Sequence, residues 1–167
     1  MNPQMVMFVA LGGAIGAVGR FMVMSAVGHF SHGAGVFGGF PWSTLTVNVL
    51  GAFILGAVIE ISALAWSPSP EIRAMVVVGM LGAFTTFSTF SMDLYYLLDR
   101  GALVSAAIYA VGPGLICLAA FALGWSALRL VLSLGNPERF FRCVDQRSTR
   151  LNSSNRFISY TLYSIKR

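Results

Sequence analysis

Charged residues are scarce in this chain of 167 residues, where they make up only 10% of the composition. Apolar residues make up 56%, and the mean hydropathy is +0.76. A soluble domain carries about 25% charged residues to cover its surface. The shortage of charge therefore excludes an ordinary soluble globular protein and favours a membrane protein, of a length that suits one domain.

Lysine is absent before Lys166, and the net charge of +5 belongs to the end of the chain. Over residues 1–132, four arginines balance four acidic residues, so the excess of positive charge lies entirely in residues 133–167. A basic tail on a neutral body does not indicate nucleic-acid binding by the whole protein. We therefore expect a lipid bilayer, and no nucleic acid, as a partner.

Cysteine is also rare, with only Cys117 and Cys143. Two such cysteines suggest neither a disulfide framework nor a metal-ligand spacing. His29 and His32 fall in one loop without a nucleophile or carboxylate constellation, so we interpret them as interfacial loop residues. These shortages make an enzyme the least favoured class.

Four apolar runs are present, each long enough to cross a bilayer, which requires roughly 20 residues per helix. Glycine and proline cluster between the runs, as expected of loops, and Ser69-Pro70-Glu71 resembles a helix start. The first run has no basic segment before it and no cleavage site after it, so we expect it to be retained. The sequence predicts spans at about residues 5–27, 43–65, 72–98 and 103–132.

The orientation signal from basic residues is nearly balanced. Four spans place Arg73 and Arg129 on one side of the membrane and Arg100 on the other, with Arg20 near the end of the first span. The positive-inside rule then gives little bias. Insertion in both orientations and orientation by another determinant both stay open.

The chain changes character after residue 132. Residues 133–167 are polar and basic without convincing periodicity, so we expect a transmembrane domain over residues 1–132 followed by a tail. Residues 145–166, DQRSTRLNSSNRFISYTLYSIK, resemble a translated sequencing adapter, which we interpret as an artefact to be left out of fold reasoning. An ordinary basic cytoplasmic tail is the alternative.

Small and polar residues break the apolar pattern of the first two spans. In GGAIGAVGRF, Gly12, Gly16 and Gly19 share one helix face, which lets another helix approach closely. Arg20, costly in hydrocarbon, fits either a snorkelling residue at the helix end or a role in transport. In PWSTLTVNVLGAFILG, Thr44 and Asn48 share a face. An Asn this deep needs a hydrogen-bond partner; interhelical bonding is its commoner use, and an amide donor lining a polar path is the alternative.

The third span contains GAFTTFSTFSMD, which interleaves hydroxyls with three phenylalanine rings. On a continuous helix, Phe84, Phe87 and Phe90 would form a drifting stripe, and Thr85 and Thr89 would share another face. Ordinary packing explains this if the hydroxyls bond back to the carbonyl four residues earlier. Alternatively, the positive ring edges attract a small anion beside the hydroxyl donors.

Gly82, followed shortly by two β-branched threonines, favours a break in the third helix between Gly82 and Thr86. A break frees backbone carbonyls that must find other partners, and a bound cation is one such partner.

These stretches, in this order within four spans, resemble the Fluc (CrcB) family of fluoride channels over about residues 5–130. The resemblance implies an all-α membrane protein with four transmembrane helices per subunit, the third broken, in an antiparallel dual-topology dimer. It implies passive, non-enzymatic export of fluoride across the bacterial inner membrane, which gives fluoride resistance. A homodimer is expected, and a heterodimer with a paralogous subunit stays open.

The resemblance also assigns roles by motif. It implies that Asn48 is a pore-lining amide, Thr44 a vestibule hydroxyl and Tyr109 a pore-side residue. Phe87 and Phe90 correspond to the ring pair that flanks fluoride. The implied polar track consists of Ser88, Thr89 and Ser91.

Gly82 and Thr85 correspond to the residues whose carbonyls, two from each subunit, hold a structural sodium ion at the dimer centre. Two positions depart from the family pattern. Asp93 stands where the family often has Glu, and the stretch around Pro113 has few hydroxyls, so the polar contacts of that region are in question.

Two other classes stay open. A small proton-coupled drug exporter needs a carboxylate within the membrane, but Glu60 and Asp93 both lie toward the ends of their spans. A membrane assembly module predicts the same packing faces without ion flux.

Overall fold

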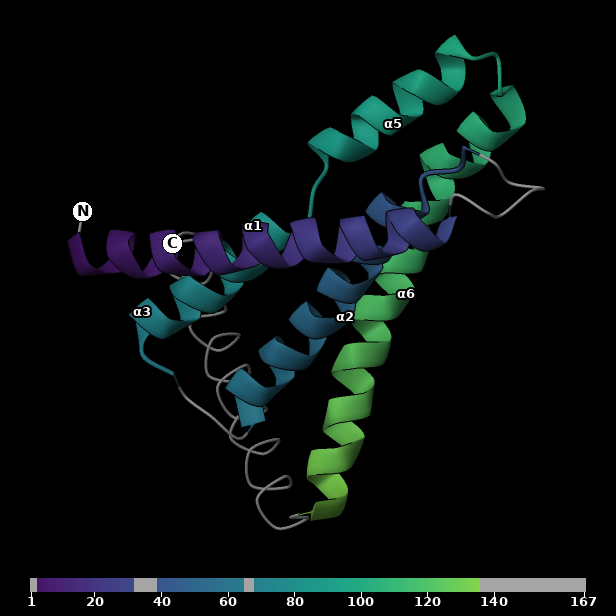
Figure 1. The fold of residues 1–167 in the computed structure, drawn as a ribbon. Helices are drawn as coiled ribbons and strands as arrows, with labels where there is room; N and C mark the ends of the chain where they lie inside the picture. Colours follow the sequence, from purple (N-terminus) through teal and green to yellow (C-terminus); the bar gives the residue numbers. More distant parts are fainter. Residues whose placement is uncertain (1–2, 32–38, 65–67, 136–167) are drawn as a thin grey trace, which may run out of the picture.

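The computed structural model describes residues 3–31, 39–64 and 68–135, and every regular element in this part is a helix (Figure 1). Its helices include four stretches long and apolar enough to cross a membrane: Pro3–His29, Trp42–Ala63, Pro70–Asp99 and Leu103–Leu134. The prediction of an all-α protein with four transmembrane helices is confirmed. His32, Cys143 and the segment 145–166 lie outside the described residues.

The elements follow one another as α1 (Pro3–Ser31), α2 (Trp42–Leu64), a composite third span and α6 (Leu103–Gly135). The third span consists of α3 (Pro70–Arg73), the π-helix η2 (Ala74–Leu81), α4 (Gly82–Phe84) and α5 (Ser88–Asp99). α2 packs along α6, and α1 packs on η2, so two helix pairs cross each other (Figure 1). α5 leaves the axis of η2 and points away from it.

Short polar signals fix the ends of the third span. The side chain of Ser69 accepts a hydrogen bond from the Ile72 N–H at 3.4 Å, and Pro70 opens the first turn, where a missing N–H costs nothing. At the other end, Gly101 has φ +70° and ends α5 in the left-handed conformation that glycine adopts without strain. The predicted helix start at Ser69-Pro70-Glu71 is confirmed.

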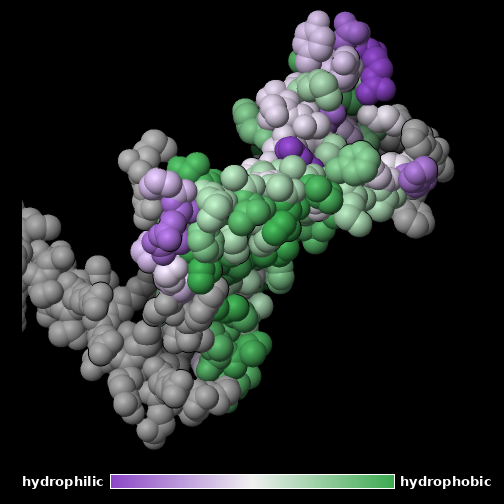
Figure 2. Space-filling view, turned by 60° about the vertical axis from the view of Figure 1, so that its left-hand side comes forward, coloured by the Kyte–Doolittle hydropathy of each residue, from purple (hydrophilic) through white to green (hydrophobic). Residues whose placement is uncertain are grey.

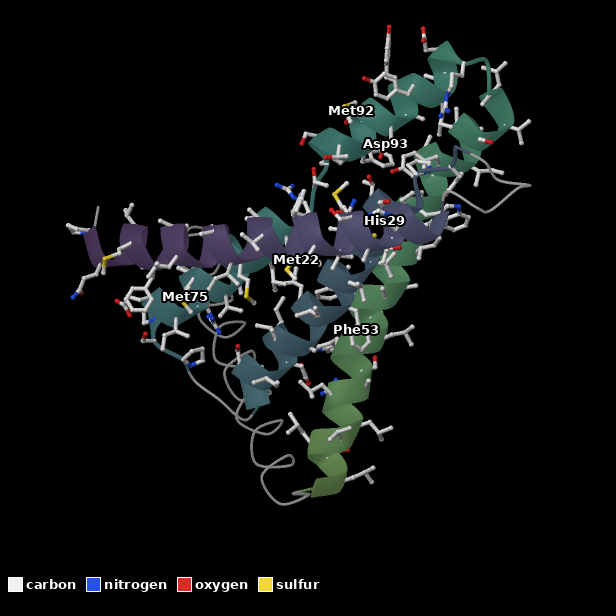
Figure 3. All side chains as sticks on the ribbon, in the orientation of Figure 1. Met22, His29, Phe53, Met75, Met92 and Asp93 are labelled. Carbon is white, nitrogen blue, oxygen red and sulfur yellow. The ribbon has the colours of Figure 1, made fainter. Side chains whose placement is uncertain are left out.

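Glycines bring the helices of each pair into backbone contact. A Cβ on Gly12 would overlap the carbonyl oxygen of Met75, and a Cβ on Gly16 would overlap that of Met80, both on η2. Figure 3 shows Met75 on the side of η2 that lies under α1. Gly56 of α2 meets the Phe121 carbonyl of α6 in the same way. The expectation of close helix approach is confirmed at these positions.

The third helix is broken, as predicted, but the break begins later than expected. Gly82 keeps helical angles (φ −64°, ψ −36°), whereas Thr85 is extended (φ −78°, ψ 158°). The helix resumes at Ser88. Thr85 and Thr89 therefore do not share a helix face, because the helix stops between them. Phe84 lies apart from the other two rings and packs near Gly19 and Gly51.

A buried ion pair joins α2 to α6 near the end of both helices. Glu60 is 2% exposed, accepts a hydrogen bond from the indole N–H of Trp125, and lies 3.6 Å from Nε of Arg129. The guanidinium of Arg129 also sits over the Trp125 ring, 5.3 Å from its centroid. Glu60 is thus a carboxylate within a span, but its charge is compensated.

Arg129→Ala is expected to destabilise the protein more than Glu60→Gln. The arginine variant leaves a buried carboxylate without a counter-ion, at a cost of about 3 kcal/mol. Glu60→Gln keeps the volume and an acceptor for the Trp125 N–H, and it leaves Arg129, whose side chain is 37% exposed and able to reach water, at a cost of about 1 kcal/mol. Thermal unfolding in detergent measures both, and the reverse order would contradict the role of the pair.

The surface carries its hydrophobic residues over the middle of the helices and its hydrophilic ones toward the ends (Figure 2). Such a belt suits a molecule surrounded by lipid. Arg20 is the exception. Because α1 continues to Ser31, Arg20 lies within the helix and not in its last turn. The choice between a snorkelling side chain and a role in transport stays open.

Candidate functional site

A groove of about 450 Å³ lies beside the break in the third span. Its walls come from α2, the break, α5 and α6. The residues that line it are Asn48, Thr85, Thr86, Phe87, Phe90, Ala110, Pro113, Gly114 and Cys117. Four of these, Asn48, Thr85, Phe87 and Phe90, were predicted as site residues from the sequence. The groove is therefore the candidate site, and it is largely apolar with an amide and two hydroxyl residues at the break.

Asn48 holds the break open. Its Nδ2 donates to the carbonyl of Thr86 at 3.0 Å, and its Oδ1 accepts from the Thr86 N–H at 2.8 Å. In a continuous helix that N–H would bond to the carbonyl of Gly82. The Asn48 side chain thus replaces the hydrogen bonds that Thr86 would make within a continuous helix. This is interhelical bonding, the commoner use of an Asn within a span. The second N–H of the Asn48 amide is not needed for this pairing and leaves a donor for a ligand.

Thr86, which the sequence indicated only as the end of the break, is a residue of the site that the sequence analysis did not select. Its Oγ1 accepts from the backbone N–H of Thr89 at 3.2 Å, which caps the first turn of α5, and donates to Oγ1 of Thr89 at 3.1 Å. It also lies 3.2 Å from the hydroxyl of Ser88. A threonine commonly accepts a hydrogen bond from the backbone N–H three residues later at the start of a helix, so the spacing of Thr86 and Thr89 could have indicated this role from the sequence.

Ser91 and Thr85 stand apart from this hydroxyl cluster. The hydroxyl of Ser91 donates to the Phe87 carbonyl at 3.0 Å, and that of Thr85 donates to the Leu81 carbonyl at 3.0 Å. The expectation that hydroxyls bond back four residues is confirmed for these two. Of the three residues in the predicted polar track, Ser88 and Thr89 are connected to each other through the hydroxyl of Thr86. Ser91 is not part of this connection.

Aromatic rings continue from the break along the groove. The ring centroids of Phe87 and Phe90 lie 5.4 Å apart, and Phe90 stacks on Tyr109 at 5.0 Å. Tyr109 is fully buried, whereas Phe87 is 78% exposed. The structure therefore brings together the two rings that were predicted to act as a pair.

Asp93 joins two more of the predicted residues, Thr44 and Tyr109, in a cluster next to the groove residue Phe90, which stacks on Tyr109. Its Oδ2 accepts hydrogen bonds from the hydroxyl of Thr44 at 2.6 Å and from that of Tyr109 at 3.2 Å. Figure 3 shows Asp93 on α5, above the upper end of α2. The shorter side chain of Asp, compared with Glu, still reaches both hydroxyls, so the carboxylate closes a three-residue cluster.

Comparison with known proteins assigns the chain to a family. Residues 7–125 match the family model described as CrcB-like protein, Camphor Resistance (CrcB). The chain belongs to the CrcB family. The match covers all of α2, the broken third span and the groove, together with most of α1 and α6.

Relatives of this CrcB chain are similar along nearly their whole length. A protein named fluoride-specific ion channel FluC from Rhodospirillum centenum is 39% identical over 130 residues, which are 78% of this chain and 99% of the relative. The protein of that name from Hahella chejuensis is 39% identical over 132 residues, 79% of this chain and 100% of the relative. That from Shewanella halifaxensis is 44% identical over 120 residues, 71% of this chain and 91% of the relative.

The α6 wall of the groove in this CrcB chain carries no hydroxyl or amide side chain, since it consists of Ala110, Pro113, Gly114 and Cys117. Pro113 is buried inside α6 and lines the groove, and its missing N–H leaves the Tyr109 carbonyl without a helical donor. Cys117 lies one turn further along the same wall. Tyr109, Pro113 and Cys117 are spaced by four, a helical period that the sequence displayed and that places them on one face.

Proposed function

We propose that this CrcB chain is a fluoride-selective channel that passively exports cytoplasmic fluoride and so gives fluoride resistance. The observation that carries the proposal is the groove in which Asn48 and the Phe87–Phe90 pair meet at a helix break. The names of the relatives, each a fluoride-specific ion channel, supply the ion. Channel function needs no catalytic residues, and the chain is not an enzyme.

Fluoride is small and strongly hydrated, so a narrow path must replace its water with other donors and still release the ion. The free N–H of the Asn48 amide and the hydroxyls around Thr86 are such donors. The positive edges of Phe87 and Phe90 add a weak attraction. No basic side chain is among the residues that line the groove, which favours conduction because a fixed cation would retain the ion.

The working unit in this proposal is an antiparallel homodimer, with a paralogous subunit as the alternative partner. A second copy would cover exposed apolar residues such as Phe87 and close the open side of the groove. A structural sodium ion fits at the break. The carbonyls of Gly82 and Thr85 have both lost their helical donors, because the Thr86 N–H bonds to Asn48 and the Thr89 N–H bonds to the Thr86 hydroxyl. Carbonyl oxygens are hard donors, suited to sodium.

The channel unit is proposed to be residues 1–132, with residues 133–167 dispensable. The support is that about 130 residues of this chain cover the whole length of relatives. α6 itself continues slightly further, to Gly135. The protein is a multi-pass membrane protein, and the bacterial inner membrane is the proposed location.

The proposal is tested by anion flux from liposomes that contain purified residues 1–135. Fluoride is expected to leave at least about 100-fold faster than chloride, a ratio that corresponds to roughly 2.7 kcal/mol. Fluoride flux should need no proton gradient, and it should fall when sodium is replaced by a large organic cation. The same protein should form dimers that chemical cross-linking captures.

Each arm of this experiment has a contrary outcome. Equal fluoride and chloride flux would overturn selectivity, and transport driven only by a proton gradient would favour an exporter. Absence of any flux together with intact dimers would favour an assembly module. Flux from the full chain but not from residues 1–135 would overturn the assignment of the tail as dispensable.

A further inference from the structure

A second groove, of about 590 Å³, lies between the C-terminal half of α2 and the start of the third span, away from the break. It exists because α2 packs mainly on α6 and η2 mainly on α1, so α2 and η2 diverge. The lining residues are Val58, Ile59, Ser62, Pro68, Pro70, Arg73, Ala74, Val77 and Val78. No residue of the proposed fluoride path is among them.

The groove offers one charged group in an otherwise apolar wall. The hydroxyl of Ser62 donates to the carbonyl of Val58 at 2.7 Å and is satisfied. Arg73 lies in the first turn of the span and is exposed, and its side chain forms no ion pair with any described residue. Glu71 is only two positions away, on a different side of the helix, and does not line the groove. The guanidinium is therefore free to meet a ligand.

We propose that this groove binds an anionic phospholipid, with the headgroup phosphate on Arg73 and an acyl chain along Ile59, Val77 and Val78. Arginine pairs with phosphate through several N–H donors in a fixed plane. The span begins at Pro70, so Arg73 lies at the level of lipid headgroups, and the apolar wall continues from it toward the bilayer centre. Basic pockets between transmembrane helices are known to hold anionic headgroups.

Native mass spectrometry of the full chain in detergent tests the proposal, with phosphatidylglycerol and phosphatidylcholine as probes. The wild type is expected to retain phosphatidylglycerol preferentially. Arg73→Gln should weaken that retention about fivefold and remove the preference. Glu71→Gln, in the same turn, is the matched control and should behave like the wild type.

A second variant tests the apolar part of the groove. Val78 is 62% exposed, so Val78→Trp fills the groove without disturbing the core, and it should lower retention of both lipids. Circular dichroism checks that the variants keep their helices.

Three results would overturn the proposal. The first is equal retention of the two lipids by the wild type. The second is full displacement by inorganic phosphate alone, which indicates a free-phosphate site. The third is a loss of dimers in Val78→Trp with lipid retention unchanged, which assigns the groove to a second copy of the chain.

Discussion

Asn48→Ala is expected to lower fluoride efflux from liposomes by about 100-fold, the usual effect of removing one preorganised donor from a charge-binding site. The amide is the only side chain that both lines the groove and bonds the backbone of the break from another helix, within the described part of the chain. Its removal takes away the free N–H and leaves the N–H and carbonyl of Thr86 unpaired. Loss of these bonds should also cost about 2 kcal/mol of stability.

Two further variants separate conduction from folding. Thr46→Ala, half a turn from Asn48 on α2, removes a hydroxyl that bonds to the Trp42 carbonyl of its own helix, and it should leave flux unchanged. Phe90→Ile keeps the Asn48–Thr86 bonds but removes the ring between Phe87 and Tyr109. It should lower flux about tenfold and cost only about 1 kcal/mol of stability, the usual worth of an aromatic pair. Unchanged flux in the double variant of Asn48→Ala and Phe90→Ile would falsify the assignment of both residues.

Gly16→Ala is expected to destabilise the protein by about 3 kcal/mol or to prevent its folding, because one methyl group forces α1 away from η2. The added Cβ would overlap the Met80 carbonyl, which belongs to backbone and has no freedom to rotate away. Separation of this pair would also shift η2 and, through it, the break at Thr85. Thermal unfolding in detergent and the yield of folded protein measure the effect.

Gly13→Ala is the matched control on the same helix, at a position off the face that carries Gly12 and Gly16. A Cβ on Gly13 would meet nothing within 4 Å, and alanine is the better helix former, so this variant should be as stable as the wild type or slightly more stable. Similar losses in Gly13→Ala and Gly16→Ala would show that the glycines act through helix flexibility and that close packing is not their role.

Periodicity and composition predicted the four spans because apolar length and loop residues are local properties. The close approach of some helix to α1 was predictable for the same reason, since Gly12 and Gly16 recur at helical spacing, but the structure was needed to identify that helix as η2. The position of the break was less predictable. Gly82 looked like the weak point by residue type, but a tertiary contact decides where the helix stops, because Asn48 takes the hydrogen bonds of Thr86.

The pairing of Glu60 with Arg129 could not be read from the sequence either, since the two residues are 69 positions apart and on different spans. The same holds for Asp93, which meets Thr44 and Tyr109 from two other helices. Residue types told which side chains needed polar partners within a membrane. Only the packing of α2, α5 and α6 shows that Glu60 pairs with Arg129 and that Asp93 bonds to Thr44 and Tyr109. The ion-binding roles of Asn48, Phe87, Phe90 and the hydroxyls stay predictions.

The bonds from Thr44 to Asp93 and from Asn48 to Thr86 have a consequence for chain length. They tie one turn of α2 to both ends of the segment 86–93, in antiparallel order. Each residue added to a helix or deleted from it rotates the remainder of that helix by about 100°. The number of residues between Thr86 and Asp93 is therefore constrained as strongly as their identity. A substitution between the two anchors leaves both of them in place, whereas a change of length would release one anchor or the other.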